Sequence, residues 1–250
     1  TALAMLQLLP AFGKILGGSI KLHGQELVGL DNSQMQAIRG NQISMIFQEP
    51  MSALNPVFTI GKQVAEPLIL HKNLTKEDAY QRAIEMLEAV GIPDPVSRAN
   101  NYPHQLSGGM RQRVMIAIAL ACEPDILIAD EPTTALDVTI QAQILDLMHD
   151  LQEKFGTSIL FISHDFGVVS RMADEIAVMY AGRVIEQGTA TEVLVKAKHP
   201  YTTALLNTTP RIDISVDRLP AIPGRVPTPA ERPQGCCFAP RCSLASETCT

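Results

Sequence analysis

The sequence lacks clusters of basic residues and lacks any apolar stretch long enough to cross a lipid bilayer. The formal net charge is −6 and the isoelectric point is near 5.5, whereas nucleic-acid phosphates are bound by grouped lysines and arginines. The longest uninterrupted apolar run, residues 114–122, is far shorter than the about 20 residues of a spanning helix. No signal peptide is visible either. We therefore expect a cytosolic chain without a nucleic-acid partner, which borrows any membrane part from other proteins.

The motif that binds nucleotide phosphates in P-loop proteins, Gly-x-x-x-x-Gly-Lys-Ser/Thr, is also missing. The sequence contains two Gly-Lys pairs, Gly13-Lys14 and Gly61-Lys62, which are followed by isoleucine and glutamine. Neither pair has a glycine five positions earlier. Any nucleotide-binding function therefore has to be argued from other motifs.

Short apolar segments typical of strands alternate with helical patterns along most of the chain. The predicted strands cover residues 19–22, 43–47, 125–129, 158–163 and 175–180. The predicted helices cover residues 1–9, 76–90, 108–122, 138–155 and 166–173. This alternation indicates an α/β fold with a parallel sheet that is covered on both faces. In such sheets, ligands bind beyond the carboxyl ends of the strands.

The amino-acid composition of the sequence changes near residue 206. Prolines recur from Pro210 to Pro240 and interrupt every helical or strand period. We therefore predict a globular domain over residues 1–206 and an irregular tail, rich in proline and cysteine, over residues 207–250.

Two adjacent carboxylates, Asp130 and Glu131, follow an apolar strand. A carboxylate at a buried strand end can hold Mg²⁺ beside a nucleotide phosphate. Its neighbour can accept a proton from an attacking water. For Asp-Glu alone an exposed acidic turn would be the favoured alternative, so the assignment depends on the other motifs.

A second motif, Leu-Ser-Gly-Gly-Met at residues 106–110, precedes a long helix. Ser107 is a good N-cap, and Gly108 and Gly109 allow an anion to approach the backbone N–H groups closely. The N-terminus of a helix attracts phosphate through its unpaired donors and its dipole. The alternative is an ordinary capped helix with a flexible entry, which explains the serine and one glycine but not the whole string.

Residues 106–113 resemble the signature motif of the ABC ATPases, and residues 126–131 resemble their Walker B strand and catalytic glutamate. The other motifs of this family occur in the expected order: Gln48 resembles the Q-loop glutamine, residues 135–137 the D-loop, and His164 the switch histidine. The resemblance covers nearly the whole chain. It implies an ABC-type P-loop NTPase fold, with a parallel-sheet core and a helical signature subdomain over about residues 60–122.

The resemblance also implies roles for the residues within one catalytic site. Asp130 and Gln48 would organise Mg²⁺, Glu131 would polarise the attacking water, and His164 would contact the γ-phosphate of ATP.

Other residues would act across a dimer, because two domains of this family close head to tail around ATP. The signature residues Ser107, Gly108 and Gly109 would contact the ATP of the partner. Asp137 would connect the two sites across the interface.

In this family the P-loop leads directly into a helix that resembles residues 1–9. We therefore expect the natural protein to begin upstream of Thr1. We also expect this chain by itself to bind ATP weakly at best, which micromolar MgATP affinity in isothermal titration would contradict.

Three further segments, residues 48–56, 102–105 and 199–206, resemble the subgroup that imports dipeptides, oligopeptides or nickel. The resemblance implies two transmembrane permease subunits, a second ABC ATPase subunit, either the same or related, and a separate solute-binding protein as partners. It places the chain at the cytoplasmic face of the cell membrane. Residues 49–66 would then face the coupling helices of the permeases.

The cysteines are unevenly distributed. Cys122 lies in an apolar helix, where burial as a small hydrophobe is expected. Cys236, Cys242 and Cys249 match the spacing in the C-terminal region of the same importer subgroup, some of whose members hold an iron–sulfur cluster there. Cys237 departs from the family pattern. A [4Fe-4S] cluster, zinc and free thiols are therefore all open interpretations of the tail.

Two rival functions are also compatible with parts of the sequence. Soluble ABC ATPases of chromosome maintenance share the main motifs, but they insert a long coiled coil where this chain has only residues 48–106. The other rival is a catalytically silent interaction or metal-binding module built around the cysteine tail. The intact pair Asp130-Glu131 and His164 weigh against it.

Overall fold

The computed structural model describes residues 1–48, 53–134, 136–208 and 221–249. The chain divides into two compact units, Thr1–Ile162 and Ser163–Thr250. The predicted boundary near residue 206 rests on proline content, whereas this division rests on contacts between residues. The boundary near residue 206 therefore stays a prediction.

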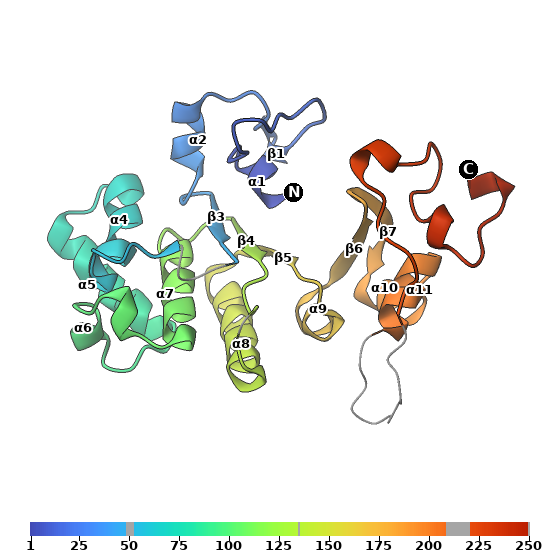
Figure 1. Cartoon of the computed structure of the whole chain (residues 1–250). Helices are drawn as coiled ribbons and strands as arrows, with labels where there is room; N and C mark the ends of the chain where they lie inside the picture. Colours follow the sequence, from blue (N-terminus) through green and yellow to red (C-terminus); the bar gives the residue numbers. More distant parts are fainter. Residues whose placement is uncertain (49–52, 135, 209–220, 250) are drawn as a thin grey trace. The chain divides into compact units, whose positions relative to one another are not determined.

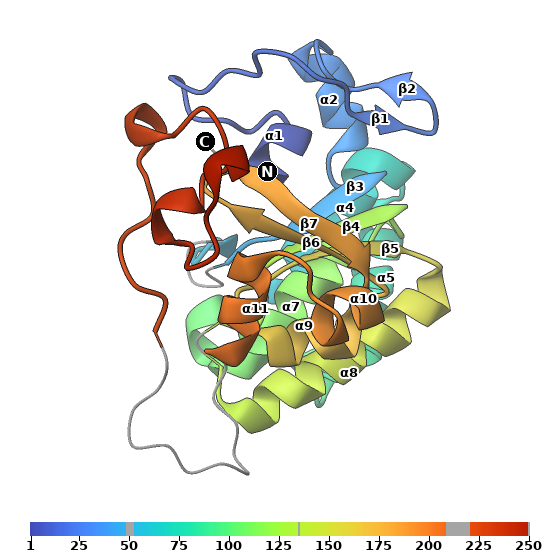
Figure 2. The same cartoon turned by 90° about the vertical axis from the view of Figure 1, so that its right-hand side faces the viewer.

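The core of the first unit is a parallel sheet of β3 (Ile43–Ile46), β4 (Ile126–Asp130) and β5 (Ser158–Ile162), in the order β3-β4-β5. In the central strand β4, Leu127, Ile128 and Ala129 are at most 1% exposed. A strand that is buried on both faces has a continuous run of apolar residues, and such a run predicted β4. In Figures 1 and 2, α2 and α8 lie on opposite sides of this sheet. The predicted α/β fold is confirmed.

The N-terminal segment packs on the parallel sheet through short elements. They are α1 (Ala2–Met5), β1 (Lys21–Leu22), β2 (Gln25–Glu26) and α2 (Asn32–Ile38). The buried side chains of this cluster are Ala2, Leu6, Leu22, Leu27, Met35, Ile38, Ile43 and Ile128.

Two predictions for the N-terminal segment were wrong in extent. The helix predicted over residues 1–9 stops at Met5, because Gln7 has a φ of 51° in the left-handed region, which no helix interior adopts. The strand predicted over residues 19–22 is only Lys21–Leu22, and it pairs antiparallel with β2 outside the parallel sheet. The turn between them has positive φ at both His23 and Gly24, as expected for a tight two-residue hairpin.

A group of helices follows β3: α4 (Ile60–Lys72), α5 (Lys76–Ala89), α6 (Pro95–Arg98) and α7 (Gly108–Leu120). Helices α4, α5 and α7 contact one another, and α7 also contacts β3 (Figure 1). Helix α5 begins at its N-cap Thr75, whose hydroxyl accepts a hydrogen bond from the backbone of Asp78, and it buries Ala79, Ala83, Met86 and Leu87. These helices occupy the range in which the helical signature subdomain is predicted.

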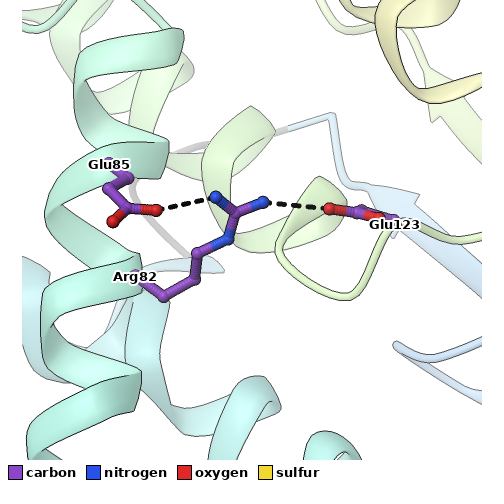
Figure 3. A network of polar contacts seen from close by, with 3 residues as sticks. All are labelled: Arg82, Glu85 and Glu123. Atoms are coloured by element: carbon purple, nitrogen blue, oxygen red, sulfur yellow. Dashed lines mark hydrogen bonds and ion pairs between the residues drawn. The ribbon is translucent and has the colours of Figure 1, made fainter.

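An ion-pair network links α5 to the turn that precedes β4 (Figure 3). Arg82 on α5 contacts Glu85 at 2.7 Å and Glu123 at 3.0 Å. Glu123 lies in the turn between α7 and β4. Because all three side chains are partly exposed to solvent, each pair contributes little stability, about 1 kcal/mol or less.

Helix α8 (Val138–Phe155) connects β4 to β5 and has the predicted bounds. Ile144, Leu145, Met148 and Leu151 form its buried stripe, at helical spacing. It ends at Gly156, whose φ of 66° is the left-handed conformation typical of a helix stop.

The second unit contains α9 (Phe166–Met172), β6 (Glu175–Tyr180), β7 (Arg183–Thr189), α10 (Ala190–Val195) and α11 (Pro200–Asn207). Strand β6 has the predicted bounds, but it pairs antiparallel with β7. Strand β7 was missed, since its sequence is only partly apolar and its hairpin turn, Ala181-Gly182, lacks the usual Asn-Gly or Asp-Gly signal.

Within the second unit the tail packs against β6 and α11 (Figure 2). The ring of Phe238 lies 5.3 Å from the rings of both Tyr180 and Tyr201. The Arg241 guanidinium donates to the hydroxyl of Tyr180 at 3.1 Å and to the carbonyl of Ile222 at 3.0 Å. The described part of the tail contains only the short 3-10 turns Pro229–Glu231, Ala239–Arg241 and Glu247–Cys249.

None of the described helices combines the length and the apolar character that crossing a bilayer requires.

Candidate functional site

Glu131 directly follows the central strand β4, in an unusual backbone conformation. Its φ is 50°, which is uncommon for a residue with a side chain. Two backbone hydrogen bonds hold it there: its N–H donates to the carbonyl of Ile162 at 2.9 Å, and its carbonyl accepts from Thr134 at 3.2 Å. Such outliers persist only where the surroundings fix them, and they gather at functional sites.

The carboxylate of Glu131 receives the side chain of Gln48, which lies 83 positions earlier in the sequence. Gln48 follows β3, and β3 neighbours β4, so the two residues meet at the carboxyl end of the sheet. The Nε2 of Gln48 donates to the Oε2 of Glu131 at 2.8 Å. The hydroxyl of Thr134 donates to the same oxygen at 3.0 Å. The structure thus brings two predicted catalytic residues together and adds a third side chain.

Asp130 is the last residue of β4 and is half-buried. Its carboxylate and the amide oxygen of Gln48 belong to the ends of neighbouring strands, and both are the hard oxygen ligands that Mg²⁺ accepts. Protein sites for this ion use one or two carboxylates together with substrate phosphates. These residues therefore fit the predicted magnesium site.

The signature residues form the exposed start of α7. Leu106 is buried at 3% exposure, and the Ser107 hydroxyl caps the helix by accepting from the N–H of Met110 at 3.3 Å. Ser107 and Gly108 are exposed, and a Cβ placed on Gly108 would meet no atom within 4 Å. The free N–H groups of this helix start are thus open to an approaching anion.

Asp137 has a local role that the sequence analysis did not assign. It is the N-cap of α8, and its carboxylate accepts from the N–H of Ile140 at 3.0 Å. The side chain is exposed. Of the other predicted D-loop and Q-loop residues, Ala135 and residues 49–52 lie outside the described part of the chain.

His164 lies in the exposed loop between β5 and α9 and belongs to the second unit. The next residue, Asp165, caps α9 by accepting from the N–H of Gly167 at 2.8 Å. The predicted contact of His164 with the γ-phosphate stays a prediction.

The cysteines of the tail make the following contacts in the structure. The N–H of Cys236 donates to the carbonyl of Cys249 at 2.9 Å, but the Sγ of Cys236 lies 3.9 Å from the Nε2 of His199. Cys242 accepts a backbone hydrogen bond instead, and Cys237 is buried with 4% exposure. Among the described residues, no group of three or more histidine, cysteine or acidic side chains could hold a metal. The [4Fe-4S] cluster that the resemblance implies therefore stays a prediction.

The prediction for Cys122 is confirmed. Its side chain is fully buried, and this burial raises the pKa of the thiol. A protonated, inaccessible thiol is expected to be inert.

Two family models match the chain. The model of the ABC transporter matches residues 4–134, which contain Gln48, the signature motif and Glu131. The chain belongs to the ABC transporter family. A second model, of the oligopeptide/dipeptide transporter C-terminal region, matches residues 185–249. The predicted family is thereby confirmed, and with it an ABC-type ATPase domain.

Curated ABC transporter subunits are similar over the whole chain. The oligopeptide transport ATP-binding protein AppD of Bacillus subtilis is 56% identical over 250 residues, which are all of this chain and 76% of AppD. The protein y4tR of Sinorhizobium fredii, described as a probable peptide ABC transporter ATP-binding protein, is 52% identical over 251 positions. That alignment covers 100% of this chain and 75% of y4tR.

Solved ABC cassettes have a similar fold. The dimeric post-hydrolysis structure of MJ0796, bound to ADP and Pi, superposes with a TM-score of 0.64 at 31% identity. The match covers 75% of this chain and 79% of the MJ0796 chain.

Proposed function

We propose that this chain is the ATP-hydrolysing subunit of an ABC importer for peptides. The observation that carries the proposal is a hydrogen bond at the carboxyl end of the central strand. The Nε2 of Gln48 donates to the Oε2 of Glu131 at 2.8 Å. The similarity to oligopeptide transport subunits over the whole chain supplies the transported class of solute. The C-terminal match to the oligopeptide/dipeptide transporter region supports the same class.

In the proposed reaction, Glu131 accepts the proton of the water that attacks the γ-phosphate of ATP. The side-chain amide of Gln48 has a donor nitrogen and an acceptor oxygen, so it can donate to Glu131 through nitrogen while its oxygen faces a metal ion. Asp130 supplies a second oxygen ligand for that ion. When bound, Mg²⁺ neutralises the charge that develops on the phosphate oxygens. His164 would contact the γ-phosphate.

The exposed start of α7 is proposed to bind the ATP of a second ATPase subunit. Ser107, Gly108 and Gly109 would present backbone N–H groups to the phosphates, and Asp137 would connect the two sites. MJ0796, which is similar in fold and sequence, is dimeric in its complex with ADP and Pi, and this supports the arrangement. The second subunit would be either another copy of this chain or a related one.

Transport by the proposed importer requires partner proteins. The similarity to importer subunits implies transmembrane permease partners, and we propose two of them. A separate solute-binding protein would select the peptide. The ATPase would then work at the cytoplasmic face of the membrane, with residues 49–66 near the coupling helices of the permeases. A [4Fe-4S] cluster is not part of the proposal.

The test uses the full-length protein assembled with its permeases in liposomes. Wild-type protein is expected to couple ATP hydrolysis to uptake of a labelled peptide. The Glu131→Gln variant is expected to bind MgATP with unchanged affinity but to lose nearly all turnover and uptake, because the amide cannot accept the proton. Turnover by this variant at the wild-type rate would remove Glu131 from the role of base, and hydrolysis without peptide uptake would exclude the importer function.

A further inference from the structure

Thr134 is held beside Glu131 by the turn that follows β4. The carbonyl of Glu131 accepts a hydrogen bond from the N–H of Thr134 at 3.2 Å, which closes a four-residue turn. Pro132 occupies the second position of this turn, where its fixed φ is favoured. The local sequence Glu-Pro-Thr-Thr thus brings the side chain of its last residue back to its first.

The hydroxyl of Thr134 uses this position to bind the carboxylate. It donates to the Oε2 of Glu131 at 3.0 Å, and Gln48 donates to the same oxygen at 2.8 Å. The terminal torsion of a glutamate side chain is otherwise soft and broadly populated. Two donors on one oxygen, coming from the ends of different segments, restrict the rotation of the carboxylate.

This restriction matters for the reaction. During hydrolysis the water oxygen forms a bond to the γ-phosphorus, the bond from this phosphorus to the oxygen of the leaving ADP breaks, and a proton of the water passes to Glu131. A base that is misdirected by about 1 Å loses much of its efficiency. The orientation of the carboxylate therefore contributes to the rate.

We propose that Thr134 is a positioning residue for ATP hydrolysis, whose hydroxyl holds the Glu131 carboxylate in the orientation that accepts the proton of the attacking water. The inference rests on the proposed function of Glu131 as base. In this role Thr134 acts through Glu131. A hydroxyl has a single donor, and in Thr134 this donor is committed to the carboxylate.

The test compares Thr134→Val with Thr134→Ser in the assembled transporter. Valine keeps the branched shape and removes the hydroxyl, so kcat is expected to fall about tenfold while KM for ATP changes less than about twofold. Serine keeps the donor and is expected to restore kcat to within about twofold of the wild type. Thr191→Val, the same exchange at an exposed position of α10, is the matched control and should leave both constants unchanged. Equal melting temperatures of the variants show that all are folded.

A double-mutant cycle tests whether the effect passes through Glu131. In the Glu131→Gln background, Thr134→Val is expected to leave the residual turnover unchanged. A further tenfold loss in that background would overturn the proposal, and so would wild-type kcat in Thr134→Val alone. Absence of ATPase activity in the wild-type transporter would instead refute the proposed function itself, so the two failures are distinguishable.

Discussion

Gly108 and Gly109 stand side by side at the start of α7, yet their surroundings differ. A Cβ on Gly108 would point into open space, whereas a Cβ on Gly109 would lie 2.9 Å from the Cγ2 of Ile140 on α8. Ile140 cannot easily move this methyl group, since β-branched side chains in helices are held in one χ1 rotamer. Within the chain, therefore, Gly109 is required by packing, while only an incoming ligand could require Gly108.

This difference leads to a prediction for the two alanine variants. Gly109→Ala is expected to lower the free energy of unfolding by about 1–3 kcal/mol, because the added methyl group overpacks the contact between α7 and α8. Gly108→Ala, the matched control, should leave this free energy unchanged or slightly higher, since alanine is the better helix former. Urea titration of both variants without nucleotide gives the comparison. Combining Gly109→Ala with Ile140→Ala should recover part of the loss, and equal stability of the two single variants would contradict the packing argument.

At the scale of helices and strands, predictions succeeded where the deciding signals were local. Helices α5, α7 and α8 start at the predicted residues. The predicted N-cap Ser107 accepts a hydrogen bond from the first turn of α7, and Thr75 and Asp137 cap α5 and α8 in the same way. The buried strand β4 was equally clear, because its apolar run ends abruptly in two carboxylates. Predictions failed where the backbone conformation of single residues determined where a helix or strand ends. The left-handed residue Gln7 ended α1 early, and the Ala181-Gly182 turn created a hairpin that no strong turn signal announced.

The same distinction between local sequence signals and backbone conformation applies to the residues of the candidate site. Glu131 and Gln48 were predictable because each follows a predicted strand within a recognisable motif. The contribution of Thr134 was not, since it depends on the positive φ of Glu131 and on the closure of the turn after it. A threonine three positions after the glutamate, with proline between them, is the only signal that the sequence offers.

A second prediction belongs to the start of α8, where Asp137 both caps the helix and is proposed to connect two catalytic sites. Asp137→Ala removes the acceptor for the N–H of Ile140 and should lower the free energy of unfolding by about 1 kcal/mol. Asp137→Asn keeps an acceptor at the cap and should be nearly as stable as the wild type, while it loses the charge. Denaturant titration gives the free energy of unfolding and so reports the contribution of the cap. The ATP turnover rate of the assembled transporter reports whether the two catalytic sites are still connected. If the asparagine variant turns over ATP like the wild type, the proposed connection does not depend on the charge of Asp137.

At the scale of the whole molecule, the residues of the proposed reaction lie in different parts of the assembly. The Walker B and Q-loop residues belong to the first unit and His164 to the second, while the signature residues are proposed to serve the ATP of another subunit. AppD and y4tR extend beyond the matched region, since it covers 76% and 75% of their lengths. The sequence could predict this division of labour only through the family resemblance. It could not predict the particular solute, because solute selection is proposed to lie in separate proteins.

The last prediction concerns the assembly of two ATPase subunits. The Glu131→Gln variant of the full-length protein should bind MgATP without consuming it, so a dimer closed around two nucleotides should accumulate. Light scattering is expected to report a monomer without nucleotide and a dimer with MgATP. Adding Asp130→Asn, which weakens the proposed Mg²⁺ site, should reduce the dimer fraction, because the bound phosphates would lose their neutralising ion. A dimer with MgATP would show that the chain can pair with itself. A monomer under both conditions would contradict self-pairing and would indicate that closure requires a related ATPase subunit or the permeases.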